Sequence, residues 1–376
     1  MSKQQLMTGN EAIARGVYEA GVRFAAAYPG TPSTEILENL TNYKEIDAQW
    51  SPNEKVALEV AYGASIAGAR SFASMKHVGL NVAADPFFTI AYTGGNAGLV
   101  VLTADEPGQH SSQNEQDNRN YARHAKVPML EPSDSTESKN MVKFAFELSE
   151  KYETPVLIRM TTRVCHSKSL VTLEDRVEKE VVPYVKDAKR YVCVPANARV
   201  RRAFVENRLD ALKEYSDNCE WNYIEDNGSK IGVIASGMAI NYAKEVFGNT
   251  ASYLKLGFTY PLPMNLIKKF VSGLDKVYVI EENDEYIEDA VKMLGFASVC
   301  YGKYAPDGSR FLPAFGELTS DVIRKAVTGK SLETIDFDHD KIIARPPALC
   351  AGCPHRGFFY ELGKRKDAIV SGDIGR

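Results

Sequence analysis

A carboxylate stands at the expected start of a helix near residue 54. Glu54 follows the turn-like sequence Ser-Pro-Asn and opens the run EKVALEVAYGASIAGA, whose apolar spacing predicts an amphipathic helix. A carboxylate in the first turn interacts favourably with the helix dipole or caps the helix, and spacing alone favours this structural interpretation. The same group in a buried setting could instead hold or move a proton as a general acid or base.

A polar run between residues 105 and 119 carries two further candidates, His110 and Arg119. A run of this length without apolar anchors is typical of a solvated loop. The glycines at 94, 95 and 98 precede an apolar strand-like segment and do not join a strand to a helix. This placement excludes the dinucleotide-binding fingerprint.

Cys350 and Cys353 form a C-x-x-C pair, with His355 two residues further on. Structural zinc sites need four ligands, and the sequence offers no second cysteine pair or nearby histidine pair to complete one. We therefore do not expect zinc here. The other four cysteines are scattered singly, a pattern that indicates no disulfide framework and fits a reducing compartment.

The overall composition limits the classes of function. The chain has 376 residues, which is too long for a single hydrophobic core. A net charge of -4 with both signs mixed gives no electrostatic footprint for nucleic acid or an anionic membrane. The sequence also shows no signal-peptide pattern and no stretch long enough to span a bilayer. We expect a cytoplasmic protein that binds small molecules or other proteins.

The elements that must position these residues follow an α/β pattern. Up to about residue 165, amphipathic helices alternate with short apolar strands, which predicts a parallel sheet covered by helices on both faces. A charged connector with one amphipathic helix follows at 166–228, and a second α/β block spans 229–330. Ligands of such sheets bind at the carboxyl ends of the strands, where the turn at Tyr28 and the polar run after Asp105 fall.

Residues 340–376 read as the opening of a third α/β domain, with a loop, a helix, a strand and a glycine turn. A strand followed by so few residues would leave an exposed edge, which compact domains avoid. We therefore expect that the sequence is truncated at the start of this domain, or that another chain completes it.

The order of several motifs resembles the thiamine diphosphate-dependent 2-oxoacid:ferredoxin oxidoreductases, most closely the large (alpha) subunit of the indolepyruvate:ferredoxin oxidoreductases. The motifs are YPGTPST at 28–34, the pair Asn53-Glu54, GASIAG at 63–68, KHVGLN at 76–81, the run 105–119, CAGCPHR at 350–356 and GDIG at 372–375. The resemblance implies four segments. These are a pyrimidine-binding domain (1–165), a connector (166–228), a transketolase C-terminal-like domain (229–330) and the incomplete beginning of a diphosphate-binding domain (340–376).

The resemblance also implies a role for Glu54. The family glutamate that precedes the glycine-alanine run by nine residues hydrogen-bonds N1′ of the cofactor's aminopyrimidine. This contact stabilises the imino tautomer, whose 4′ nitrogen removes the C2 proton of the thiazolium. Tyr28, Pro29, Gly30 and Thr31 are implied to bind the same cofactor.

A 2-oxoacid needs a cationic or hydrogen-bonding clamp for its carboxylate. By resemblance, the candidates for contacting the substrate are Lys76, His77, Asn81, His110 and Arg119. The resemblance outweighs the solvated-loop interpretation of 105–119 but assigns no single role within it.

The two C-terminal motifs resemble the family's diphosphate domain. Cys350, Cys353 and His355 are implied to lie near the cofactor. Gly372, Asp373 and Gly375 match the start of the diphosphate motif and are implied to bind the cofactor.

Asp373 is the implied ligand of a magnesium ion, which accepts one or two protein carboxylates. Family members continue the diphosphate motif with a cysteine where this chain has Arg376. Iron-sulfur clusters are expected only in the missing C-terminal part.

The implied activity belongs to amino-acid catabolism. It is the oxidative decarboxylation of indolepyruvate, or another aryl 2-oxoacid, to an acyl-coenzyme A, with electrons passed to ferredoxin through iron-sulfur clusters. The implied partners are coenzyme A, ferredoxin and a smaller beta- or gamma-type subunit, in a homo- or hetero-oligomer. The alternative is a non-catalytic or split subunit that supplies only the pyrimidine half of the site or acts in assembly. In either case we expect no turnover by this chain alone.

Overall fold

Short polar side chains fix the starts of helices that the apolar spacing predicts. The structure, a computed structural model, describes residues 3–333, 335, 338–343 and 348–371. Thr8 and Glu11 form a capping box at the start of α1 (Gly9–Glu19). The helix predicted from Glu54 is α3 (Glu54–Ile66), where the Asn53 side chain accepts the Val56 N–H at 3.0 Å.

A seven-stranded sheet forms the centre of the first α/β block, in the order β12-β6-β7-β5-β4-β2-β3. Its strands are β2 (Phe24–Ala27), β3 (Asp47–Trp50), β4 (Ser71–Lys76), β5 (Leu99–Asp105), β6 (Met129–Leu130), β7 (Val156–Thr161) and β12 (Phe258–Tyr260). All neighbours are parallel except β12, which is antiparallel to β6. The predicted α/β class with a parallel sheet is confirmed.

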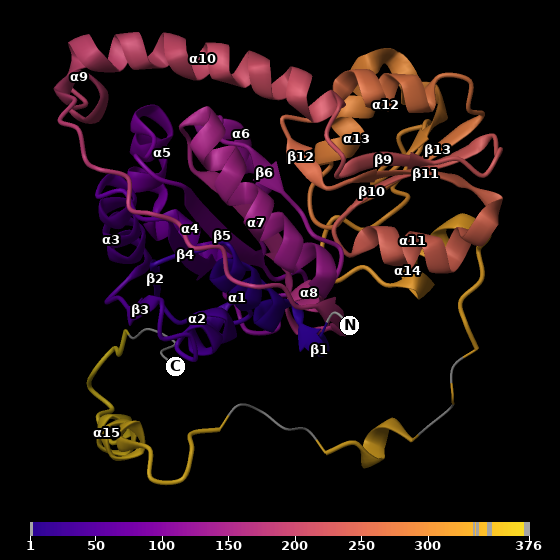
Figure 1. Cartoon of the computed structure of the whole chain (residues 1–376). Coiled ribbons are helices and arrows are strands. Elements are labelled where there is room, and N and C mark those ends of the chain that lie inside the picture. The colour runs from indigo at the N-terminus through magenta and orange to yellow at the C-terminus, as the bar shows by residue number, and fades with distance from the viewer. Residues whose placement is uncertain (1–2, 334, 336–337, 344–347, 372–376) are drawn as a thin grey trace. The chain divides into compact units, whose positions relative to one another are not determined.

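Helices cover both faces of this sheet (Figure 1). They are α1, α2 (Thr34–Leu40), α7 (Ser135–Tyr152) and α8 (Thr162–His166) on one face, and α3, α4 (His77–Val82), α5 (Ala84–Thr93) and α6 (Arg119–Ala125) on the other. Side chains alternate between the two cores along β5, because Val100 and Leu102 pack on the first face and Leu99 and Val101 on the second. A strand buried on both faces explains the continuous apolar run in the sequence.

A five-stranded sheet organises the second α/β block, in the order β14-β13-β10-β11-β9. Its strands are β9 (Asn222–Glu225), β10 (Ile231–Ser236), β11 (Ser252–Leu256), β13 (Lys276–Ile280) and β14 (Cys300–Tyr301). The helices around it are α11 (Ala239–Phe247), η1 (Gly248–Thr250), α12 (Met264–Val271), α13 (Tyr286–Val291), η2 (Lys292–Phe296), η3 (Ala297–Val299) and α14 (Ser320–Thr328). The block's two cores lie under α11 and α14 and under α12 and α13.

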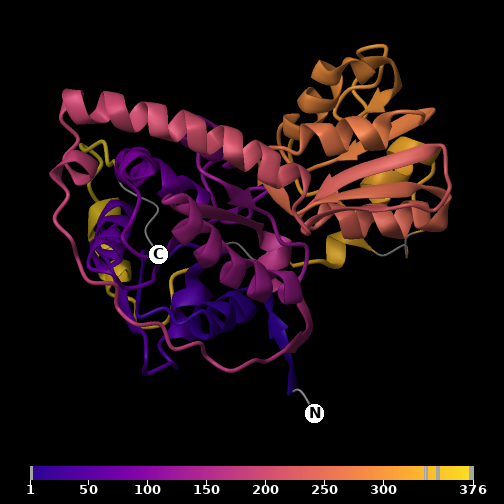
Figure 2. The ribbon, with the colours of Figure 1, turned by 45° about the horizontal axis from the view of Figure 1, so that its top comes forward.

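The connector joins the two blocks. It begins with β8 (Lys168–Thr172), which pairs antiparallel with β1 (Gln4–Thr8), and continues through α9 (Ala188–Tyr191) to α10 (Pro195–Asp217). Figure 2 shows α10 running along the first block and ending at the second, in agreement with its contacts to α5 and α12. The sequence predicts this helix only around 202–215, so it begins earlier than expected. The domain boundaries themselves stay a prediction.

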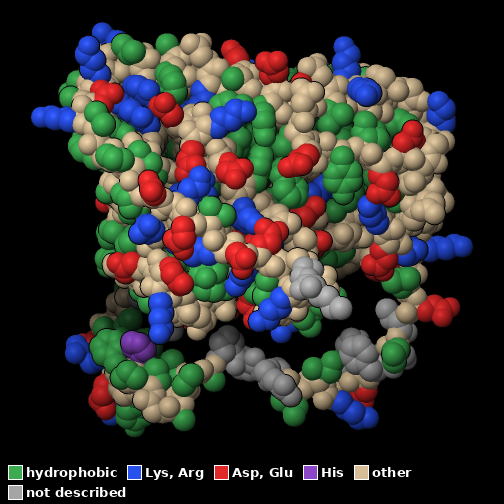
Figure 3. All heavy atoms as spheres, viewed as in Figure 1, with side chains coloured by type: hydrophobic (Ala, Val, Ile, Leu, Met, Phe, Trp, Pro, Cys, Tyr) green, Lys and Arg blue, Asp and Glu red, His purple; other side chains and the backbone are tan. Residues whose placement is uncertain are grey.

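The surface of residues 3–331 carries both charge signs. On the face drawn in Figure 3, basic and acidic side chains are interspersed over this part of the chain. Such mixing produces no extended field of one sign on that face. Among the described helices, none combines the length and the apolar character needed to cross a bilayer.

Residues 332–376 form a separate unit. Its described elements are η4 (His339–Lys341) and α15 (Pro354–Gly363). The sequence predicts a strand after α15, but residues 366–371 form none. A strand needs a partner to pair with, and the described part of this unit contains no other strand.

Candidate functional site

The carboxyl ends of β2 and β4 lie side by side where the strand order reverses. From β2 the chain adds β3 on one side of the sheet, and then β4, β5 and β7 on the other. Ligands of open α/β sheets bind at such a switch point, outside the carboxyl ends of the strands. The turn after β2 and the Lys76-His77 pair at the end of β4 therefore stand at the expected binding edge.

Glu54 reaches this edge from the first turn of α3. Its side chain is largely buried, with 7% of the residue exposed. Gly79 in α4 lies directly against it, because a β-carbon at position 79 would stand 2.5 Å from Glu54 Oε1 and 2.7 Å from its Cγ. The glycine thus leaves room that the Glu54 carboxylate occupies. The structure positions this carboxylate between two helices as well as at a helix terminus.

The turn after β2 is held by its own side chains. Thr34 Oγ1 accepts the Gly30 N–H at 2.8 Å, and Ser33 Oγ donates to the Gly30 carbonyl at 2.9 Å. Asn10 Nδ2 donates to the Pro32 carbonyl at 2.7 Å, which ties the turn to α1. These bonds fix the loop that holds Tyr28, Pro29, Gly30 and Thr31, with Tyr28 and Thr31 exposed and Gly30 buried.

Lys76 and His77 lie at the end of β4 and face the loop 105–119. Lys76 Nζ donates to the Ser111 carbonyl at 3.2 Å and lies 3.9 Å from a Glu106 carboxylate oxygen. His77 is fully buried, and its Nε2 lies 3.0 Å from the Asn114 carbonyl. Its Nδ1 has no hydrogen-bond partner among the described residues. A buried ring nitrogen without a protein partner is a group that a ligand would satisfy.

The loop 105–119 has buried roots and an exposed tip. Glu106 is buried and accepts the Ser111 N–H at 3.1 Å, together with the Ser111 and Ser112 hydroxyls. His110 lies at the exposed tip. The solvated-loop interpretation therefore describes the tip alone, since the rest of the loop is anchored to protein groups.

Two of the candidate substrate residues have other partners. Asn81 accepts the Tyr121 hydroxyl at 2.6 Å, at the edge of an open groove of about 580 Å³ that Phe88 and His124 also line. Arg119 is fully buried, and it donates to Asp117, to Glu281 and to the Glu282 and Asp284 carbonyls. The structure thus brings Lys76 and His77 to the binding edge but places Arg119 in the protein interior.

A buried charge network that no local sequence pattern predicts surrounds Arg119. Arg159 donates to Asp105 at 2.6 Å and to Glu131. Burial opposes ionisation of Asp117, but the charges of Arg119 and Arg159 outweigh it and lower the Asp117 pKa to about 2.

The second block supplies carboxylates to this network, and burial raises the pKa of both of them. The Glu281 pKa stands above its ordinary value, and the Glu282 pKa is raised to about 7. Asn283 beside them accepts Arg159 Nη2 at 3.0 Å. Arg119 and Glu281 are 162 positions apart in the sequence, so no local spacing signals their contact.

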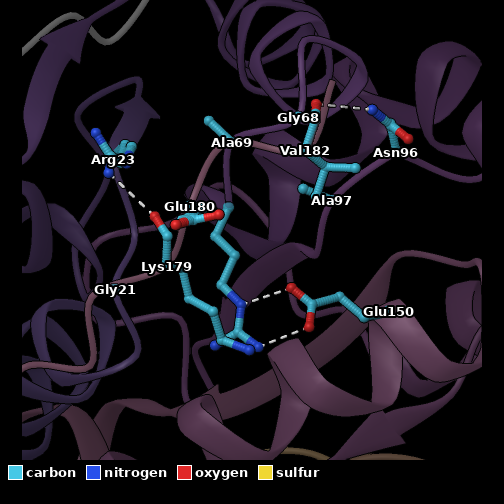
Figure 4. A pocket seen from close by; sticks show the side chains of 11 residues that line it. Gly21, Arg23, Gly68, Ala69, Asn96, Ala97, Glu150, Lys179, Glu180 and Val182 are labelled. Atoms are coloured by element: carbon cyan, nitrogen blue, oxygen red, sulfur yellow. Dashed lines mark hydrogen bonds and ion pairs between the residues drawn. The ribbon is translucent and has the colours of Figure 1, made fainter. Parts of the chain in front are cut away.

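A cavity of about 250 Å³ lies at the opposite, amino edge of the sheet (Figure 4). Arg70 binds both Glu150 carboxylate oxygens, at 2.6 and 2.7 Å, and Arg23 donates to the Lys179 carbonyl. Asn96 donates to the Val182 carbonyl. The Arg23 and Asn96 bonds hold the connector against the block, and Arg70 and Glu150 form an ion pair within the block.

The C-terminal candidates lie in the separate unit. Cys350 is exposed, and its carbonyl accepts the Cys353 N–H at 3.1 Å in a turn that leads into α15. Cys353 directly precedes that helix without a side-chain capping bond, and His355 is exposed in its first turn. Gly372, Asp373 and Gly375 lie outside the described residues. Among the residues that are described, no group of three His, Cys, Asp or Glu side chains is arranged to hold a metal.

Comparison with known proteins gives relatives along nearly the whole chain. "Indolepyruvate oxidoreductase subunit IorA" of Methanothermobacter marburgensis is 45% identical over 394 residues, covering 98% of this chain and 63% of the relative. The protein of the same name from Archaeoglobus fulgidus is 41% identical over 399 residues, again covering 98% of this chain and 63% of the relative. The chain thus spans less than two thirds of the length of these relatives.

Solved structures share the fold, and two of them are compared with this chain by overall superposition. The 2-oxoglutarate:ferredoxin oxidoreductase from Magnetococcus marinus, solved with 2-oxoglutarate, coenzyme A and succinyl-CoA bound, superposes with a TM-score of 0.68 at 17% identity and covers 87% of this chain and 65% of that one. A split-gene transketolase, described as an inactive beta4 tetramer, gives a TM-score of 0.52 at 17% identity, covering 86% and 97%. At these identities the likeness concerns the fold alone.

A family model matches residues 15–213, a segment that contains the binding edge, Glu54, the loop 105–119 and most of α10. Its description is "Pyruvate flavodoxin/ferredoxin oxidoreductase, thiamine diP-bdg". The resemblance seen in the sequence motifs is confirmed, and the chain belongs to the thiamine diphosphate-binding family of the pyruvate flavodoxin/ferredoxin oxidoreductases.

Proposed function

We propose that this chain supplies the aminopyrimidine-activating half of a thiamine diphosphate site in an indolepyruvate:ferredoxin oxidoreductase, with Glu54 as the activating carboxylate. The observation that supports the proposal is the placement of Glu54, which is buried against Gly79 beside the carboxyl ends of β2 and β4. The names of the most similar relatives favour indolepyruvate as the 2-oxoacid.

The described residues fit the aminopyrimidine side of the cofactor on two observations. Gly79 leaves the space in which the Glu54 carboxylate lies, which orients the carboxylate in one direction. His77 Nδ1 lies buried on the same helix, α4, and has no partner within the described part of the chain. A carboxylate and an imidazole nitrogen can each hold a proton or share a hydrogen bond with a nitrogen heterocycle.

When bound, thiamine diphosphate supplies a nucleophilic carbon and an electron sink for decarboxylation. Glu54 would hold a proton between its carboxyl group and the pyrimidine ring nitrogen, as a general acid and base. Burial of the Glu54 side chain would keep water away from that proton. The turn of Tyr28, Pro29, Gly30 and Thr31, fixed by Ser33 and Thr34, would form the wall beside the ring.

For the substrate, we propose that Lys76 and His77 provide the cationic and hydrogen-bonding side of the pocket. His110 on the exposed loop tip is a third contact in this proposal. Arg119 has its donors directed to Asp117, Glu281 and two carbonyls, which favours a structural role for it over a clamp on the substrate carboxylate. Asn81, bonded to Tyr121, would line the outer part of the pocket.

The remaining parts of the activity are also proposals for the whole protein. Coenzyme A and ferredoxin would be the co-substrates, and magnesium and iron-sulfur clusters the further cofactors. A smaller subunit would complete the oligomer. The six cysteines of this chain form no disulfide, which supports a cytoplasmic location for the protein.

The proposed role of Glu54 is tested in the purified complex by viologen reduction with indolepyruvate and coenzyme A. Glu54→Gln should lower kcat by roughly 10²- to 10⁴-fold, the contribution of a positioned general acid or base. Glu59→Gln, on the exposed side of the same helix, is the matched control and should keep kcat within about twofold of the unchanged protein. Full turnover by Glu54→Gln would contradict the assignment. If none of the aryl 2-oxoacids tested supports viologen reduction by the unchanged complex, the proposed activity itself is refuted.

The alternative of a non-catalytic or split subunit is not favoured, because the most similar relatives are named as subunits of an oxidoreductase. Binding of thiamine diphosphate without any turnover by the complex would revive it.

A further inference from the structure

The tip of the loop 105–119 is bonded on two sides. On its inner side, Lys76 and His77 contact the Ser111 and Asn114 carbonyls. On its other side stands Glu115, whose Oε1 accepts the Gly108 N–H at 2.7 Å. This bond joins the two ends of the exposed tip. Besides Glu106, the tip is therefore held by a second carboxylate, Glu115, which is not among the candidates from the sequence.

The same Glu115 oxygen also accepts the Gly316 N–H of the second α/β block, at 2.9 Å. Hydrogen bonds to an ionised carboxylate are stronger than neutral ones. Gly316 has φ of +79°, a backbone region that favours glycine. The contact thus combines a charged acceptor with a backbone conformation that few other residues adopt.

The segment around Gly316 is itself fixed to the first block and to the charge network. Glu317 binds Arg163 of α8 through two hydrogen bonds, at 2.8 and 2.6 Å. Lys303 Nζ donates to the Pro313 carbonyl at 2.9 Å and to the Glu281 carbonyl. The second block therefore holds the loop at its root, through Glu281, and at its tip, through Gly316.

We propose that Glu115 is a positioning residue that holds the loop 105–119 against the second α/β block through Gly316. We call this contact the latch. This inference rests on the proposed function of the carboxyl edge. Lys76, His77 and His110 face or belong to the loop, so its displacement would misplace the groups that receive the 2-oxoacid. The Glu115 carboxylate accepts the Gly108 and Gly316 N–H groups, so its loss should act on the substrate side of the site and leave activation of the cofactor unchanged.

The test uses Glu115→Ala and Glu115→Gln in the full-length protein within its purified complex. Glu115→Ala should lower kcat/KM for the 2-oxoacid by about ten- to a hundredfold, the cost of a misplaced binding loop. Affinity for thiamine diphosphate should stay unchanged. Glu115→Gln should restore most of kcat/KM, because its amide oxygen can still accept both N–H groups. Glu147→Ala, an exposed carboxylate on α7, is the matched control.

Gly316→Ala tests the other end of the latch. A β-carbon there meets no atom within 4 Å, so the substitution acts through backbone strain alone. The double variant Glu115→Ala/Gly316→Ala should lose no more kcat/KM than the more affected single variant, because both substitutions disturb the same interaction. Additive losses, or an unchanged kcat/KM for Glu115→Ala, would overturn the proposal.

Hydrogen exchange separates this proposal from the proposed function. Glu115→Ala should speed amide exchange in 107–111 and 315–317 by on the order of tenfold, because it removes two charged hydrogen bonds. This readout needs no substrate. A complex without turnover would refute the activity, whereas unchanged exchange would refute the latch.

Discussion

The two parallel sheets place polar side chains at their carboxyl edges in contrasting ways. In the first block, this edge carries Glu54, Lys76 and His77, and a buried His77 nitrogen has no protein partner among the described residues. In the second block, β13 runs directly into Glu281, whose carboxylate accepts Arg119 and the Ile287 and Glu288 N–H groups. Both edges follow the same topological rule, but the second edge is filled by protein groups.

The difference indicates what turns such an edge into a binding site. Position at the end of a parallel strand brings polar groups together, but a ligand binds only where the protein leaves some of their hydrogen-bonding capacity unused. At the edge of β13, that capacity is spent on joining the two blocks.

The largest effect is expected from removing the cation at the filled edge. Arg119→Met leaves the buried Asp117 and Glu281 carboxylates without their main partner, which should lower the free energy of unfolding by about 3–5 kcal/mol. Urea denaturation measures this loss of unfolding free energy. Arg123→Met, on the exposed side of the same helix, is the control. Equal losses in the two variants would show that the network does not hold the blocks.

The pH dependence of stability probes the same edge. Burial raises the Glu282 pKa to about 7 in the folded protein, above the ordinary value of 4.5. Its contribution to stability is therefore complete below about pH 4.5 and is lost as the pH rises to about 7.

Glu282→Gln removes this dependence. The variant should be more stable than the unchanged protein at pH 8, by up to about 3 kcal/mol, and this gain should vanish near pH 4.5. Urea midpoints measured across this pH range test it. A gain that does not vary with pH would contradict the assignment.

The smallest of the three effects concerns the open edge. In Gly79→Ala, the new β-carbon would stand 2.5 Å from Glu54 Oε1, so the carboxylate must move. We expect about a tenfold loss of kcat, since small displacements of an oriented group are costly. Gly63→Ala in α3 is the control. Its β-carbon would meet no atom within 4 Å and alanine favours the helix, so kcat should stay unchanged. Viologen reduction measures both, and a fully active Gly79→Ala would argue against the orientation of Glu54.

Local patterns in the sequence predict the elements that carry the open edge. The apolar spacing after Asn53 predicts α3 from its first residue, and the continuous apolar run at 99–105 predicts a strand buried on both faces. The position of Glu54 at the start of α3 follows from local rules for helix starts. The proposed catalytic role of Glu54 does not follow from those rules, because a carboxylate at a helix start also has an ordinary structural explanation.

Long-range contacts account for what the sequence does not reveal. Glu115 and Gly316 are 201 positions apart, and Arg119 and Glu281 are 162 apart. Periodicity reports which face of an element is buried, but it does not say which distant polar groups meet there. Arg119 illustrates this, since an arginine in a polar run looks alike whether its partner is a ligand or a buried carboxylate, and its role toward the substrate stays a prediction.

The strand β12 belongs to the second block by sequence but completes the sheet of the first. Phe258 and Tyr260 pair with β6, at what would otherwise be an open edge. A recombinant fragment ending within the connector would expose that edge to other chains and would tend to aggregate. A fragment for expression should therefore include the whole second block, since β13 pairs with β10 and Glu281 neutralises the buried Arg119.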